Sequence, residues 1–108
     1  MANEQKVKKI YVCDTDFSER EVRGYKLDGQ WILILKFQGS YHAMDASCAH
    51  SGYPLFKGTI DEKGVLTCPL HYAQFNCQTG AIVSEPPICP NQDLFDIAVE
   101  DNKIYWLK

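Results

Sequence analysis

The sequence has no long apolar run, no excess of basic charge and no leader-like first segment. Its longest apolar candidate, residues 31–35, is far shorter than the ~20 residues of a membrane-spanning helix. Residues 1–6 are polar, so we expect a cytoplasmic protein without a membrane anchor. With 14 acidic and 11 basic residues, the formal net charge of −3 argues against nucleic acid as the main partner.

The signatures of common enzyme sites are also missing. No glycine-rich phosphate loop or dinucleotide fingerprint is present, so NADH or flavin would have to bind to a partner. Of three histidines, His50 and His71 belong to the motif described below, which leaves His42 with a surface or packing role. A mononuclear iron site of the oxygenase type needs two histidines and a carboxylate. We therefore predict no catalytic residues.

The 108 residues are enough for one small domain, and a hydrophobic content of 45% is typical of globular proteins. Short segments rich in apolar and β-branched residues, many of them alternating, predict strands, and residues 14–21 allow one helical turn at most. The turn pairs Asp28-Gly29 and Asp101-Asn102 predict hairpins. The fold class is therefore all-β. The expected strands are residues 8–13, 21–27, 31–37, 41–45, 65–68, 75–77, 81–83, 94–99 and 104–107.

The single predicted domain divides by character into two parts. Residues 1–45 and 88–108 carry most of the expected strands and form a β base. Residues 46–87 are rich in loops, and Pro86 and Pro87 exclude a central strand or helix near their end, because proline removes a backbone donor and restricts φ.

Two cysteine–histidine pairs lie within the loop-rich part. One residue separates Cys48 from His50, and two separate Cys68 from His71. Thiolates together with imidazoles suit zinc or an iron–sulfur cluster better than calcium or magnesium. In a reducing compartment, cysteines beside histidines are more consistent with metal ligands than with disulfides. The remaining cysteines are expected to be small buried side chains, and the pairing of the last two stays open: Cys13, Cys77 and Cys89.

Two kinds of metal centre compete for these four residues. A structural zinc ion accepts two cysteines and two histidines, but zinc fingers usually pair cysteine with cysteine and histidine with histidine. In this sequence each half contributes one of each. Such a set fits a Rieske [2Fe–2S] centre, in which two histidines replace two cysteines on one iron. A structural zinc site stays open as the alternative.

The pattern C-x-H…C-x-x-H resembles the signature of Rieske [2Fe–2S] proteins, and Gly52, Gly80 and the Pro86-Pro87 loop fit the same family. The resemblance covers residues 31–108. It implies the Rieske fold, which consists of stacked antiparallel sheets with the cluster at the tip of an inserted cluster-binding subdomain.

The resemblance also implies one [2Fe–2S] cluster per chain and a set of ligands. Cys48 and Cys68 would hold one buried iron, and His50 and His71 would hold the other iron, nearer the surface. With two thiolates and two neutral imidazoles, the oxidised core would be about neutral, so it accepts an electron more readily than a core with four thiolates.

Four positions differ from the respiratory branch of the family. Tyr53 and Leu70 stand where that branch has a pair of disulfide-bonded cysteines. Ala73 and Phe75 stand where respiratory and photosynthetic members place hydroxyl donors. Because hydrogen bonds to the cluster raise its potential, we predict a midpoint below zero, within the Rieske range of roughly −150 to +300 mV.

By the same resemblance the chain is a soluble one-electron carrier, not an enzyme. It would take electrons from a flavoprotein or another reductase and pass them to an oxygenase or another redox acceptor. The alternative is a small Rieske-like subunit of a reductase complex, of the nitrite reductase small-subunit type. The residues predicted to surround the cluster or form its docking face are Ser51, Gly52, Tyr53, Pro54, Leu70, Tyr72, Ala73, Phe75, Pro86 and Pro87. Acidic side chains that would steer a basic partner are Asp14, Asp16, Glu19 and Glu85.

Overall fold

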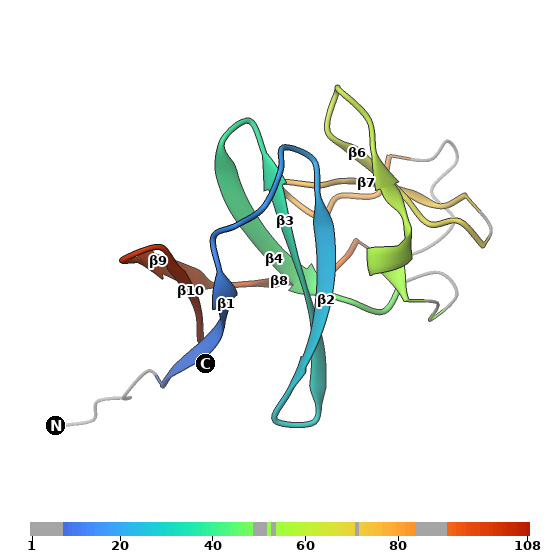
Figure 1. Cartoon of the computed structure of the whole chain (residues 1–108). Helices are drawn as coiled ribbons and strands as arrows, with labels where there is room; N and C mark the ends of the chain where they lie inside the picture. The colour runs from blue at the N-terminus through green and yellow to red at the C-terminus, as the bar shows by residue number, and fades with distance from the viewer. Residues whose placement is uncertain (1–7, 49–51, 53, 71, 84–90) are drawn as a thin grey trace, which may run out of the picture.

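The computed structural model describes residues 8–48, 52, 54–70, 72–83 and 91–108. Its strands form three antiparallel sheets, which follow one another across the molecule in Figure 1. The first sheet has the order β1 (Lys9–Asp14), β10 (Lys103–Leu107) and β9 (Ile97–Glu100). The central sheet has the order β2 (Val22–Leu27), β3 (Gln30–Phe37), β4 (Ser40–Asp45) and β8 (Leu94–Phe95). The third sheet has the order β5 (Thr59–Ile60), β6 (Val65–Thr67) and β7 (Gln74–Asn76).

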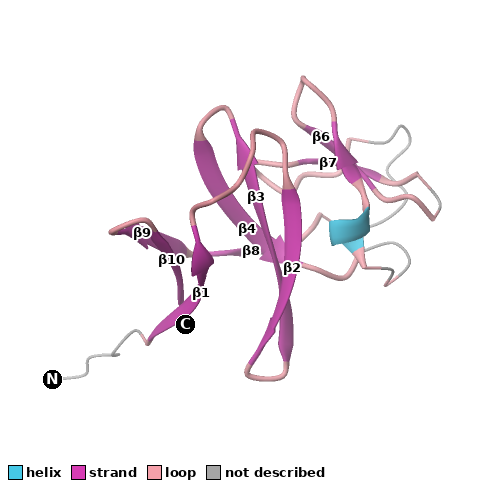
Figure 2. Ribbon diagram, in the orientation of Figure 1, coloured by secondary structure: helices cyan, strands magenta, loops and turns pink. Residues whose placement is uncertain are grey.

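This architecture confirms the expected all-β fold of stacked antiparallel sheets. In the described residues, helical structure is limited to the 3₁₀ turn η1 (Leu55–Lys57), drawn in cyan in Figure 2. No helix in that part of the chain is long and apolar enough to cross a membrane.

The hairpins close through pairs of residues with left-handed backbone. Asp28 and Gly29 join β2 to β3 with φ values of 54° and 79°, and Asp101 and Asn102 join β9 to β10 with 51° and 63°. Such pairs match the right-handed twist of the flanking strands. Both turns predicted from the sequence are therefore confirmed.

The central strand β3 separates two hydrophobic cores. Its side chains alternate, and because both faces are buried, Ile32 and Ile34 point to one core while Leu33 and Leu35 point to the other. The core on the side of the first sheet contains Val12, Phe17, Ala43, Ile104 and Trp106. The second core, on the side of the third sheet, contains Met44, Leu55, Ile60, Leu66, Phe75 and both motif cysteines, Cys48 and Cys68.

An aromatic contact joins the central sheet to η1. The Phe56 ring stacks on Trp31 with a centroid separation of 5.5 Å and an interplanar angle of 20°. The same ring lies so close to Gly24 of β2 that a Cβ atom there would be 2.2 Å from Phe56 Cδ2. Only glycine therefore allows η1 to approach β2 in this way.

Residues 15–21 contain a bend and a turn and no helical turn, in agreement with the expected limit of one turn. Two details of the expected strand pattern were wrong. The expected strand 81–83 has a single bridge, Phe75 with Ile82, and the Ile82 N–H donates to the Asn91 side chain at 2.9 Å.

The expected strand 94–99 divides between two sheets. Phe95 pairs with Ala43 in the central sheet, whereas Ile97 pairs with Trp106 in the first sheet. The chain crosses from one sheet to the other at Asp96. Val99 is exposed on edge strand β9.

Candidate metal centre

The two motif cysteines begin loops with the same backbone closure. The Gly52 N–H donates to the Cys48 carbonyl at 2.7 Å, and the Tyr72 N–H donates to the Cys68 carbonyl at 2.9 Å. The residue that closes each loop has left-handed backbone, with φ of 76° at Gly52 and 60° at Tyr72. Two segments that are separate in sequence therefore curl back four residues after a cysteine in the same way.

Both thiols are buried between the central and third sheets. Cys48 is 3% exposed and Cys68 is fully buried. Thiolate sulfur is a ligand that zinc and iron–sulfur clusters accept. Two buried thiols at the start of matching loops therefore fit the cysteine half of the predicted centre.

The histidine half, His50 and His71, lies outside the described residues. In the part of the chain that the structure describes, no group of three or more His, Cys, Asp or Glu side chains gathers in a way that would hold a metal ion. The structure accordingly places two of the four predicted ligands.

The predicted surrounding residues separate into a buried floor and an exposed face. Ala73 and Phe75 are fully buried, and the Ala73 carbonyl accepts the Cys68 N–H at 2.8 Å. Ala73 and Phe75 therefore pack in the same core as Cys68 and are not available to a docking partner. Leu70 and Tyr72 are exposed by 46% and 72%, which leaves them available to a partner. Gly52 is exposed and Pro54 is partly buried, whereas the other predicted members lie outside the described residues: Ser51, Tyr53, Pro86 and Pro87.

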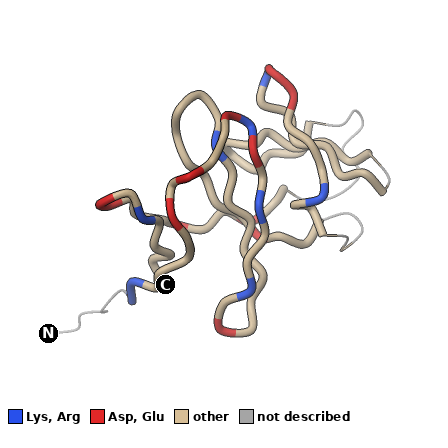
Figure 3. Tube along the Cα trace, viewed as in Figure 1, with Lys and Arg blue, Asp and Glu red and all other residues tan. Residues whose placement is uncertain are grey.

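The segments that carry the cysteines contain no charged residue. Residues 46–56 and 64–84 lack Asp, Glu, Lys and Arg entirely. Figure 3 shows the described parts of these segments in tan. The charged residues that border them in sequence are Asp45, Lys57, Lys63 and Glu85. The exposed side chains of Leu70, Tyr72 and Val83 therefore belong to a segment without charged residues.

Three of the acidic residues that were expected to steer a partner make contacts within the chain. Asp16 pairs with Arg23 at 2.8 Å. The Glu19 carboxylate accepts the N–H groups of Gln38 and Gly39 in the β3–β4 turn, and these bonds lower the pKa of Glu19. Asp16 and Glu19 lie in the β1–β2 connection. Glu85 lies outside the described residues.

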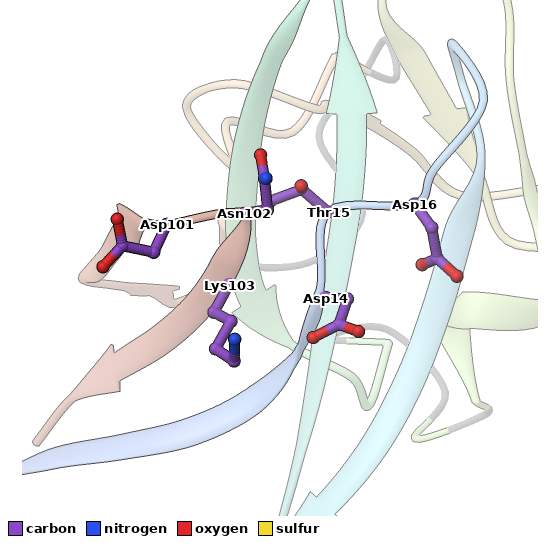
Figure 4. A pocket seen from close by; sticks show the side chains of 6 residues that line it. All are labelled: Asp14, Thr15, Asp16, Asp101, Asn102 and Lys103. Carbon is purple, nitrogen blue, oxygen red and sulfur yellow. The ribbon is translucent and has the colours of Figure 1, made fainter.

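A hollow lies at the opposite end of the molecule from the third sheet. It has a volume of about 370 Å³ and opens between the β1–β2 connection and the β9–β10 turn. Figure 4 shows its three carboxylates spread around the rim without a common focus. Asp14 accepts the Tyr11 hydroxyl at 2.6 Å, so this acidic surface is explained by ordinary pairing. The lining residues are Asp14, Thr15, Asp16, Asp101, Asn102 and Lys103.

His42 lies opposite Leu35, on the face of the central sheet that carries the second core. Its Nε2 is the one buried side-chain nitrogen or oxygen among the described residues that has no hydrogen-bond partner. Burial lowers the pKa of His42. The expected packing role therefore agrees with its position.

The free energy of unfolding is expected to decrease as the pH falls from 7.5 to 5.5, in part through His42. The unfolded chain binds a proton at His42 more readily than the folded chain does. The stability that comes from keeping His42 neutral is therefore complete above the unfolded pKa, about 6.5, and is lost as the pH falls below it. Urea unfolding of the protein and of His42→Gln at both pH values measures this. The variant should lose less stability across the interval, and equal losses would contradict the prediction.

One residue beside the centre was missed from the sequence. Gln92 is buried, and its amide nitrogen donates to the carbonyls of Asp45 and Ser47, just before Cys48. A lone glutamine after a proline-rich segment carries no sequence signal of such a role, because its partners lie 45 and 47 residues away.

Comparison with known proteins adds independent information. The sequence model of the Rieske [2Fe–2S] domain family matches residues 8–98. The ferredoxin component of an alkene monooxygenase system from Xanthobacter autotrophicus is 27% identical over 104 residues, which cover 95% of this chain and 84% of that protein. Human apoptosis-inducing factor 3 is 33% identical over 95 residues, or 87% of this chain, but the chain spans only 15% of that longer protein.

Solved structures agree with these matches. The ferredoxin of carbazole 1,9a-dioxygenase from Nocardioides aromaticivorans IC177 superposes with a TM-score of 0.82 at 23% identity, covering 92% of this chain and 96% of that one. A chain in a complex of reduced oxygenase and oxidised ferredoxin of carbazole 1,9a-dioxygenase also gives 0.82, at 26% identity and 92% coverage of both chains.

Proposed function

Since the chain belongs to the Rieske [2Fe–2S] domain family, we propose that it is a one-electron carrier between a reductase and an oxygenase or a related acceptor. The family match means that the chain carries one [2Fe–2S] cluster. One observation carries the functional proposal: relatives matched over most of their own length, such as the Xanthobacter component, are ferredoxins of oxygenase systems. A flavoprotein donor and a cytoplasmic location are part of the same proposal.

We propose that Cys48, Cys68, His50 and His71 hold the cluster. When bound, the cluster supplies a single electron that can be accepted and released. Cys48 and Cys68 are buried against the second core, so they would hold their iron away from water. The loop closures at Gly52 and Tyr72 would keep both thiolates in place in either oxidation state.

We also propose that a single domain contains both the part that binds the cluster and the part that supports it. Its β base would comprise residues 1–45 and 88–108, and its cluster-binding subdomain residues 46–87. The position of both cysteines on the side of the third sheet, beyond the central sheet, supports this division.

The partner would dock on the uncharged segments near the cysteines, where the side chains of Leu70, Tyr72 and Val83 are exposed. A hollow of about 260 Å³ lies along the first cysteine loop, lined by Trp31, Ala46, Ser47, Gly52, Pro54 and Phe56. Because these segments carry no charge, association would depend on apolar contact more than on electrostatic steering. The related carbazole ferredoxin, found in complex with its oxygenase, supports a partner of that class.

A redox titration followed by electron paramagnetic resonance (EPR) tests the proposal. We expect a single one-electron step, a rhombic signal in the reduced state and a midpoint potential below zero, in the low part of the Rieske range of roughly −150 to +300 mV. The physical reason is that Ala73 and Phe75 supply no hydroxyl donor to the cluster. A midpoint well above about +100 mV would contradict the low potential. A colourless protein with stoichiometric zinc would overturn the proposal.

A further inference from the structure

Gln92 is a buried polar residue that lies two positions before the start of β8. It is 4% exposed, and its Nε2 donates to the carbonyl oxygens of Asp45 and Ser47, both at 2.8 Å. An amide nitrogen has two hydrogens, so these two bonds use its full donor capacity. Both acceptors precede Cys48 by no more than three residues.

The backbone between β4 and Cys48 has a partner for every polar group. The Asp45 N–H donates to Asp93 at 2.9 Å, and the Ala46 N–H donates to Trp31 at 3.4 Å. The Ala46 carbonyl accepts from Leu55 at 2.7 Å, and the Ser47 N–H donates to the Asp45 side chain at 2.9 Å. The two remaining groups, the carbonyls of Asp45 and Ser47, are those that accept from Gln92.

The same segment is tied to the chain that follows the second cysteine. The Gln92 N–H donates to the Gly80 carbonyl at 2.8 Å, and the Asn91 side chain accepts the Ile82 N–H at 2.9 Å. A Cβ atom on Gly80 would lie 2.5 Å from the Gln92 carbonyl oxygen, so the two backbones are in close contact. Gln92 therefore connects residues 45–47, which precede Cys48, with the segment that follows β7.

We propose that Gln92 is a positioning residue for the cluster. By holding the Ser47 carbonyl, it orients the first cysteine loop, and through Gly80 it keeps this loop in register with the second. The inference rests on the proposed role of Cys48 as a ligand. A side chain of similar length without donors would remove the partner of both carbonyls and free the loop to move.

The test compares Gln92→Met with Gln78→Met, which removes the same amide from an exposed site. In Gln92→Met we expect the cluster to be lost to a chelator about ten-fold faster or more, and the reduced-state EPR signal to shift or broaden, because the Asp45 and Ser47 carbonyls lose their donor. Gln78→Met should stay within about two-fold of the parent protein.

A lower melting temperature with an unchanged EPR spectrum and cluster-loss rate would show a merely structural role and overturn the proposal. If Gln92→Met does not fold, Gln92→Asn decides: it keeps the amide on a shorter side chain, and behaviour like the parent protein would also overturn it. Cys48→Ala separates the two proposals. If that variant keeps its cluster, the ligand assignment fails; if it loses the cluster while Gln92→Met is unaffected, only the role of Gln92 fails.

Discussion

Alanine in place of Cys48 or Cys68 is expected to give a colourless protein, with bound iron falling from about two atoms per chain to nearly none. Each substitution removes a thiolate from a buried position. In the described residues no further metal-binding group gathers that would replace it. Iron and sulfide analysis, together with the visible absorption spectrum, measures the loss.

Cys77→Ala is the matched control. Cys77 is also fully buried in the second core, but burial raises the pKa of its thiol to about 11, so the sulfur is protonated at neutral pH. This variant should keep its iron. Loss of iron from Cys77→Ala, with retention in Cys48→Ala, would show that the ligand set has been assigned wrongly.

The second large effect is expected at Gly24. In Gly24→Ala the new methyl group would lie 2.2 Å from the Phe56 ring, so the ring must leave its place between β2 and Trp31. Overpacking of this kind typically costs about 1–3 kcal/mol of stability. Urea unfolding of the protein measures the loss, and Trp31 fluorescence should report the displaced ring.

The double variant Gly24→Ala/Phe56→Ala distinguishes this clash from a general effect of alanine in β2. With the ring absent, the methyl group has room, so adding Gly24→Ala to Phe56→Ala should cost little further stability. Strictly additive losses would mean that the contact between Gly24 and Phe56 is not the cause.

Local chemistry explains which parts of the fold were predictable. The Asp28-Gly29 and Asp101-Asn102 turns were anticipated because a hairpin turn depends mainly on its own two residues. The burial of β3 on both faces followed from its continuous apolar run. Strand 94–99 was wrong in detail, since alternation predicts extended chain but not the sheet with which each half pairs.

The candidate centre likewise has features that the sequence predicted and features that it did not. The spacing of Cys48, His50, Cys68 and His71 was sufficient for the family and its cofactor, and the family match confirms both. Spacing carries this information because a metal centre restricts the types and separations of its ligands along the chain.

The roles of Gln92, Gly24 and Phe56 became visible only in the folded molecule. Gln92 contacts carbonyls 45 and 47 residues away, and the Phe56 ring occupies the space that a side chain at position 24 would need. Such contacts arise when sheets pack together, and no local pattern encodes them. The amino-acid sequence therefore predicted the ligands of the centre, whereas only the packing of the three sheets revealed the contacts of Gln92, Gly24 and Phe56.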